Sequence, residues 1–122
     1  LQVWVHPIPA KALVTSKPSE SSMEVRSRVN SARNRQRIRY KADSTNCNAE
    51  LHGDAIRRAA NPNPEALKTL QMTMESHGLS GRAWSRILKV ARTIADLEGR
   101  DQVMTTHILE ASSFRLNLEL EP

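Results

Sequence analysis

Apolar residues recur at helical spacing between Ser80 and Gly99, and this is the clearest pattern in the sequence. Ser80 is a favourable N-cap residue, and Gly99 can adopt the left-handed conformation that often ends a helix. Because residues three and four apart share one face of a helix, the pattern predicts a long amphipathic helix with a buried stripe. The stripe consists of Trp84, Ile87, Leu88, Ala91, Ile94 and Ala95.

Three further segments carry the helical pattern and have recognisable starting signals. Ser21-Ser22-Met23-Glu24 is a capping box, which predicts a long helix that runs to about Tyr40. Asn63-Pro64-Glu65 offers an N-cap, a proline at the first helical position and an acid that suits the helix dipole. Thr105 is a plausible N-cap for a last helix, and residues 54–60 are expected to form a short helical turn.

The first 19 residues do not fit the helical pattern. Leu1–Val5 is a short β-prone run, and the prolines after it favour an extended backbone. We expect this run to be frayed or docked on the helices, since a lone strand has no pairing partner, and residues 10–19 to be a linker. The chain then divides into a strand and linker at 1–19, a helical domain at 20–115 and a C-terminal tail at 116–122. The expected fold is an all-α small helical bundle of four main helices plus one short helix.

Composition agrees with a helical core and narrows the class of protein. The 122 residues suffice for one domain, and only 3% of them are aromatic, so the core depends on aliphatic side chains. No apolar run approaches the ~20 residues of a membrane span, and we expect a soluble, cytoplasmic protein with no membrane contact. Cys47 has no second cysteine to pair with, and the four histidines lie far apart in sequence, so no metal site is predicted.

A net charge of +5 and a pI near 10.0 favour an acidic partner. Most of the excess charge lies in the helix that begins near Ser21, where Glu24 is the only acid. A phosphate backbone, the acidic surface of a neighbouring subunit and simple solvation all fit this face. Tyr40 is the only aromatic residue nearby, which argues against base stacking. The candidate contacts to nucleic acid or a subunit are Arg26, Arg28, Arg33, Arg35 and Arg37.

A second row of polar and positive side chains follows the long helix after Ser80, beside its apolar stripe. Arg82 lies in the first turn, where the helix dipole disfavours a cation. Its position favours an external anion, although a solvated arginine also fits the pattern. Arg92 lies to one side of the row and is expected to pair with Asp96 at i+4. The row consists of Arg82, Arg86, Lys89 and Thr93.

The run Gly78–Trp84 followed by Arg86–Leu97 resembles the C-terminal lid of the magnesium-chelatase-related AAA+ ATPases, and within them the YifB/ComM branch. Other segments resemble the same family in the same order. Leu1–Val5 is similar to the final strand of the ATPase core, Glu20–Arg26 to the first lid helix and His107–Ala111 to the last. The resemblance covers most of the chain and implies that the helical domain is such a lid.

The resemblance also implies a chemical role for the row of cations. Arg82 occupies the position of the sensor-2 arginine, which in the family reaches from the lid towards the γ-phosphate of ATP. Arg86 and Lys89 are secondary nucleotide-binding candidates. ATP and Mg²⁺ are the implied cofactors of the full-length protein. The implied partners are a preceding N-terminal ATPase domain, neighbouring subunits in a hexamer, and DNA.

The 122 residues contain no Gly-x-x-x-x-Gly-Lys-Ser/Thr phosphate loop and no acidic pair after a strand to hold Mg²⁺. We therefore expect this chain by itself to be inactive as an ATPase and to hold no cofactor alone. The alternative function is a free-standing basic helical module that binds nucleic acid non-specifically. A purely structural oligomerisation piece is the third possibility.

Overall fold

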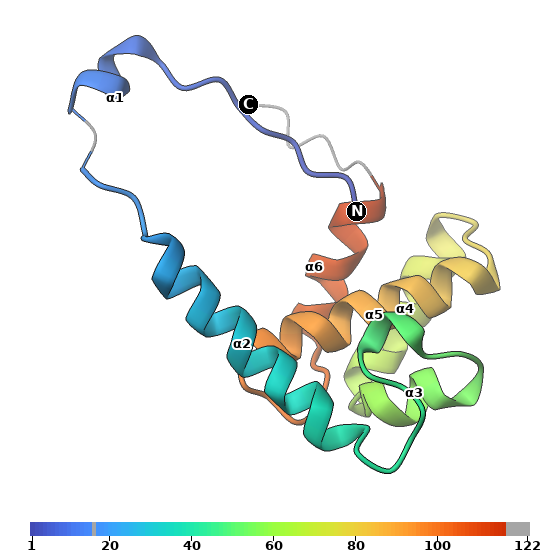
Figure 1. Ribbon diagram of the computed structural model, residues 1–122. Helices are drawn as coiled ribbons and strands as arrows, with labels where there is room; N and C mark the ends of the chain where they lie inside the picture. The colour runs from blue at the N-terminus through green and yellow to red at the C-terminus, as the bar shows by residue number, and fades with distance from the viewer. Residues whose placement is uncertain (16, 117–122) are drawn as a thin grey trace.

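The computed structural model describes residues 1–15 and 17–116, which form helices joined by loops and contain no strand (Figure 1). The expected all-α bundle is confirmed. Within the described residues, no helix is long and apolar enough to cross a membrane. The elements are α1 (Ala10–Thr15), α2 (Ser22–Arg39), the 3₁₀ helix η1 (Asn48–Glu50), α3 (Asp54–Ala60), α4 (Pro64–Ser76), α5 (Gly81–Leu97) and α6 (Thr105–Leu116).

Helix α5 lies at the centre of the bundle and contacts α2, α3, α6 and η1. Its predicted apolar stripe is buried except for Trp84, which is half-buried. Gly99 has a φ of 72°, and the backbone N–H of Arg100 donates to Ala95 O at 2.8 Å, so the predicted left-handed stop is confirmed. The apolar core around α5 includes Ile56, Leu70, Ile87, Leu88, Val103 and Ile108.

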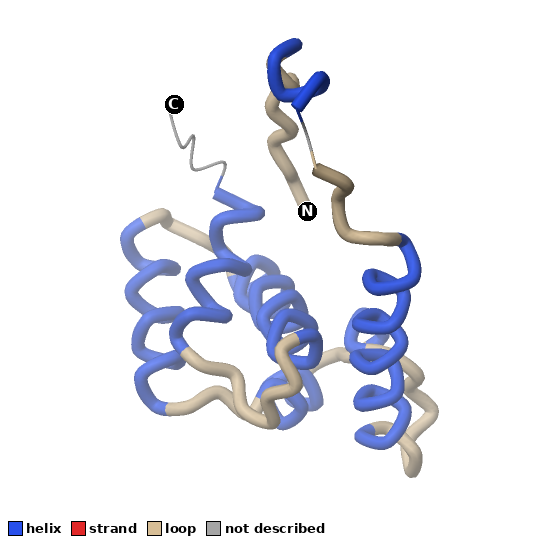
Figure 2. The backbone as a smooth tube through the Cα atoms, turned by 90° about the vertical axis from the view of Figure 1, so that its left-hand side faces the viewer, coloured by secondary structure: helices blue, strands red, loops and turns tan. Residues whose placement is uncertain are grey.

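Helix α4 begins and ends as its sequence predicts. The Asn63 side chain accepts a hydrogen bond from Ala66 N at 2.7 Å, and Pro64 occupies the first turn. Gly78 has a φ of 57° and closes the helix, so that α5 follows after a tight turn. The short connection predicts an antiparallel pair with α5, but α4 packs chiefly against α6 (Figure 2).

The N-terminal segment differs in part from its prediction. Leu1–Val5 forms no strand, and it is docked on a helix, which is one of the two outcomes expected for it. It runs alongside the end of α6, where Gln2 N donates to Phe114 O at 3.1 Å. Residues 10–19 are not a plain linker, because α1 forms within them. Its helix-favouring sequence starts where the Pro9 carbonyl accepts the amides of the first turn, and it buries no side chain. The predicted tail at 116–122 lies outside the described residues beyond Leu116.

Arg92 is fully buried and ties α5 to the loop that precedes α6. It forms the predicted ion pair with Asp96, at 3.1 Å between Nη2 and Oδ1, but the sequence pattern did not predict its burial. Its guanidinium also donates to the carbonyls of Asp101, at 2.6 Å, and of Arg100. Burial lowers the pKa of Arg92, and the Asp96 charge opposes that shift. One arginine thus closes the turn between α5 and α6.

A polar network attaches α2 and η1 to α5. The Asp96 carboxylate accepts hydrogen bonds from Arg39, at 3.0 Å, and from the Asn48 side chain, at 2.9 Å. Asn48 in turn accepts from the Tyr40 hydroxyl at 2.6 Å, and its backbone amide donates to the Gln36 side chain at 3.0 Å. These polar groups are satisfied by one another, as burial requires. The position of α2 therefore depends on the Asp96 carboxylate.

We predict that Asp96→Ala lowers the free energy of unfolding by about 3–5 kcal/mol, because it leaves buried arginine charge without its partner. Urea denaturation followed by circular dichroism measures the loss. Glu20→Ala is the control, since it removes the exposed Glu20–Arg28 pair and should cost less than about 1 kcal/mol. Similar losses in both variants would contradict the role given to Asp96.

Candidate functional site

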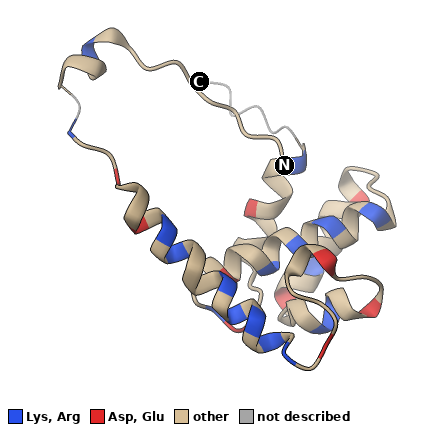
Figure 3. Cartoon of the chain, viewed as in Figure 1, with Lys and Arg blue, Asp and Glu red and all other residues tan. Residues whose placement is uncertain are grey.

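The row of candidate nucleotide-binding residues lies along one side of α5, next to its buried face. Figure 3 shows the basic positions along this helix. Arg82 is exposed in the first turn, and Arg86 is exposed one turn further on. Ser80 is the N-cap residue, as predicted, and its side chain makes no capping hydrogen bond. The first turn of α5 thus presents a cation at the positive end of the helix dipole. Such a terminus is suited to bind an anion.

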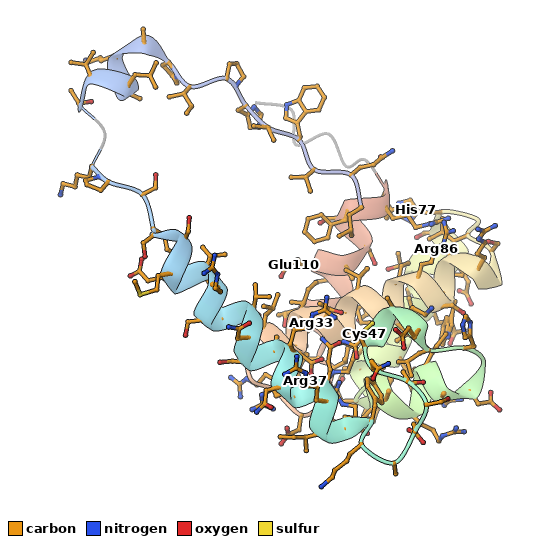
Figure 4. All side chains as sticks on the ribbon, viewed as in Figure 1. Arg33, Arg37, Cys47, His77, Arg86 and Glu110 are labelled. Atoms are coloured by element: carbon orange, nitrogen blue, oxygen red, sulfur yellow. The ribbon has the colours of Figure 1, made fainter. Side chains whose placement is uncertain are left out.

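A groove of about 980 Å³ follows this row along α5 and opens between α5 and α6. Arg86, Lys89 and Thr93 line the groove, whereas Arg82, one helical turn before Arg86, does not. The structure therefore brings three of the four members of the row into one concave surface. Figure 4 labels one of them, Arg86. The apolar lining includes Leu79, Val90, Ile94, Leu97, Ala111 and Phe114.

Lys89 makes a specific contact within the protein. Its Nζ donates to the backbone carbonyl of Ala49 at 2.9 Å, which ties α5 to η1. A lysine engaged in this way supplies less free charge to a ligand than the exposed Arg86. Its role in nucleotide binding stays a prediction, and Arg82 and Arg86 are the exposed cations of the row.

The five candidate cations of α2 fall into two groups. Arg28 forms an ion pair with Glu20, and Arg35 pairs with Asp101 at 3.0 Å. The other three are exposed and have no ion-pair partner within residues 1–15 and 17–116. They follow i, i+7 and i+11 spacing and so share one side of α2. We call Arg26, Arg33 and Arg37 the α2 cation face. Figure 3 shows the basic positions along α2, and Figure 4 labels Arg33 and Arg37.

The first half of α2 lies clear of the bundle. Every residue from 22 to 31 is exposed, whereas Ala32 and Gln36 are buried in the second half of α2 and Arg39 joins the helix to Asp96 of α5. The capping box at Ser21 and Glu24 forms as predicted, and it supports the helix where tertiary contacts are lacking. The Ser21 hydrogen bonds lower the pKa of Glu24, which keeps its carboxylate charged at the helix N-terminus. The α2 cation face is therefore accessible along its length.

Among the described residues, no three histidine, cysteine, aspartate or glutamate side chains are grouped closely enough to hold a metal ion. Cys47 is a half-buried free thiol. His107 is buried and holds the start of α6, since its Nδ1 accepts from Met104 N at 2.9 Å and its Nε2 faces Glu98.

Sequence patterns missed the groove and the polar network. The groove could have been suspected from Val90 and Leu97, which follow Arg86 at i+4 and i+11 and continue its row as an apolar edge. The network had no such signal. Asn48 lies in a segment rich in Asn, Ser and Thr that reads as an ordinary loop, yet it is almost fully buried.

The magnesium chelatase, subunit ChlI C-terminal family matches residues 19–115 of the chain. The chain belongs to this family. Among its relatives are the protein YifB of Salmonella typhimurium, 40% identical over 111 residues, and the competence protein ComM of Haemophilus influenzae, 37% identical over 106 residues. The protein Rv2897c of Mycobacterium tuberculosis is 34% identical over 115 residues.

These matches cover most of this chain but a small part of each relative. They span 89%, 87% and 94% of the chain, against 21%, 20% and 23% of YifB, ComM and Rv2897c, respectively. The chain thus spans about a fifth of the length of the relatives that it matches. The activity of those longer proteins is therefore not assigned to the domain described here.

Proposed function

We propose that the chain is the C-terminal lid of a magnesium-chelatase-like AAA+ ATPase of the ComM type, and that Arg82 is its sensor arginine. The family match and the ComM relative support the lid assignment. The observation that carries the role of Arg82 is its exposed position in the first turn of α5, at the end of the groove row. The preceding ATPase domain, in this proposal, binds ATP and supplies the phosphate loop.

Arg82 acts as a fixed positive charge. Its guanidinium remains protonated at any working pH and can donate two parallel hydrogen bonds to phosphate oxygens. Because α5 is held by its buried face, this charge is placed before the reaction begins, and it stabilises the negative charge that develops on the transferred phosphoryl group. Arg86, one turn further along, is the second cation near the same ligand.

Among residues 1–15 and 17–116, no three acidic, histidine or cysteine side chains are grouped closely enough to hold a metal ion. We propose that the preceding domain supplies the ligands of Mg²⁺. We further propose a cytoplasmic protein in which neighbouring subunits form a hexameric ring.

We predict that Arg82→Ala in the intact ATPase lowers kcat for ATP hydrolysis by at least about 100-fold, the usual cost of removing one transition-state donor. Steady-state phosphate release measures the effect, and thermal unfolding should be unchanged because Arg82 is exposed. Arg58→Ala on α3 is the control, since Arg58 is also an exposed arginine but does not belong to the row of cations on α5. Equal turnover in the two variants would exclude the sensor role.

We also propose that the parent motor acts on DNA and that the α2 cation face contacts its phosphate backbone. Support comes from Arg26, Arg33 and Arg37, which are exposed, share one side of α2 and have no acidic partner among the described residues. Cations spread along a helix release condensed counterions when they meet phosphates, without reading the base sequence. The alternative, a free-standing module, uses the same surface but needs no nucleotide.

The salt dependence of DNA binding tests the α2 cation face. We predict that Arg33→Ala with Arg37→Ala makes the plot of log K against log salt concentration less steep by about 1.8, or about 0.9 for each lost phosphate contact. Fluorescence anisotropy with a short DNA duplex measures the slope. Arg28→Ala with Arg35→Ala removes the same net charge from cations already paired with carboxylates, and should change the slope less.

Equal changes in the two double variants would show that net charge alone drives binding, and would reject the α2 cation face.

DNA binding also distinguishes the motor from the free-standing module. A free-standing module binds DNA equally well with and without nucleotide and the upstream domain, whereas the motor requires both for its activity.

A further inference from the structure

We infer that Arg28 and Arg35 form a second phosphate-binding site on α2, and that two carboxylates of the same chain occupy it. We call these two arginines the masked site. The carboxylates stand where phosphate groups of a DNA backbone would bind, so the chain limits its own affinity for DNA. The inference rests on the proposed function, because it takes α2 to be the DNA-binding helix.

Two sides of α2 carry arginines at the same spacing. Arg28, Arg35 and Arg39 follow i, i+7 and i+11, which is also the spacing of the α2 cation face two residues earlier. Two residues turn a helix by about 200°, so the second row lies on the opposite side of α2. Ala32 and Gln36, the buried residues of α2, share this side. The α2 cation face thus points away from the bundle, and the second row lies on the side that meets it.

Both arginines of the masked site are bound to carboxylates. Arg28 donates through its two Nη atoms to the two carboxylate oxygens of Glu20, with Nη2 at 3.0 Å from Oε2. Arg35 Nη1 donates to Asp101 Oδ1 at 3.0 Å. A guanidinium binds two phosphate oxygens through the same pair of parallel hydrogen bonds. Each carboxylate therefore occupies a place that suits a phosphate group.

These two ion pairs lie at the surface and are open to exchange. The side chain of Asp101 is 98% exposed, and those of Glu20 and Arg28 are 42% and 55% exposed. Ion pairs of this kind contribute little to stability, because water and salt screen them. A carboxylate that loses its arginine here is solvated rather than buried without a partner. A phosphate chain therefore displaces it at a small cost.

Arg39 differs from the other two members of its row, because its partner is buried. The Asp96 carboxylate has no exposed surface, and the side chain of Arg39 is only 22% exposed. Separation of this pair would leave Asp96 with less compensation in the interior, which is costly. The contact between Arg39 and Asp96 therefore keeps α2 on the bundle while the masked site exchanges its partners.

Both carboxylates are held close to their arginines by the fold. Glu20 precedes Arg28 by eight residues, at the start of α2, where Figure 3 shows acidic positions next to basic ones. Asp101 lies in the turn after α5, and Arg92 fixes that turn through the Asp101 carbonyl at 2.6 Å. A tethered group acts at a high effective concentration. The carboxylates thus compete against phosphate, and a polynucleotide with many linked phosphates competes better than a free phosphate ion.

Removal of the two carboxylates tests this inference. Glu20→Gln with Asp101→Asn frees the masked site and retains every cation of α2. The control is Asp54→Asn with Glu65→Gln, which removes the same charge from exposed acids of α3 and α4 that form no ion pair within residues 1–15 and 17–116. Fluorescence anisotropy with a short DNA duplex measures the affinity of the 122-residue chain.

We predict that Glu20→Gln with Asp101→Asn binds DNA at least about threefold more tightly than the control, because two exposed ion pairs no longer compete. The plot of log K against log salt concentration should also become steeper, by up to about 1.8, since up to two more phosphates are contacted. Thermal unfolding should change little in either variant, because all four carboxylates are exposed.

A second comparison separates the masked site from net charge. Arg28→Ala with Arg35→Ala should make the salt plot less steep by about 1.8 when Glu20 and Asp101 are already replaced by their amides. The same two arginine substitutions should change the slope less in the unaltered chain, where the carboxylates hold both arginines. The difference between the two effects is the coupling that the masked site predicts.

Equal affinities of the two carboxylate variants would overturn the inference. An equal effect of the arginine substitutions with and without the carboxylates would also overturn it. The α2 cation face is reported separately, by Arg33→Ala with Arg37→Ala. An effect of that variant without an effect of the carboxylates would reject the masked site alone, and the reverse result would reject the α2 cation face alone. If neither the unaltered chain nor Glu20→Gln with Asp101→Asn binds DNA, both sites are rejected.

Discussion

The carboxylate of Asp96 has no solvent-exposed surface, and it forms ion pairs and hydrogen bonds with three parts of the fold. Arg92 on the same helix holds the turn towards α6, Arg39 brings in α2, and Asn48 brings in η1. A buried charge is tolerated only when its partners are close and well oriented, so the burial of Asp96 constrains these elements to one arrangement. The fixed orientation of α5, on which the groove and the cation row depend, follows from this constraint together with the aliphatic core.

The proposed sensor residue and the proposed DNA-binding face lie on different helices, and α5 connects them. The N-terminal turn of α5 carries Arg82, and its C-terminal half carries Asp96, which holds α2 and its cation face. A shift of α5 at a bound nucleotide would therefore move the attachment of α2 as well. A purely hydrophobic interface would join the helices less specifically. Apolar packing tolerates more arrangements than a charged network of fixed partners does.

Local signals account for what the sequence predicted well. The capping box of α2, the Asn63 cap of α4 and the glycine stop of α5 each involve residues a few positions apart, and all formed as expected. The bonds from Asp96 to Arg39 and Asn48 join residues 57 and 48 positions apart, so no local pattern could indicate them. The groove depends on how α6 and the first residues pack against α5, which is likewise a long-range property. The pairing of Arg92 with Asp96 was predicted, but its burial was not. An arginine is usually exposed, and the sequence does not indicate the backbone carbonyls to which its guanidinium donates.

The central claim is that α5 presents Arg82 to the terminal phosphate of a nucleotide held by the preceding domain. It is tested most directly by a structure of the intact protein with a non-hydrolysable ATP analogue and Mg²⁺. The account predicts the Arg82 guanidinium within hydrogen-bonding distance of a γ-phosphate oxygen, at about 2.7–2.9 Å. An Arg82 side chain that points into solvent while the nucleotide site is filled would contradict it.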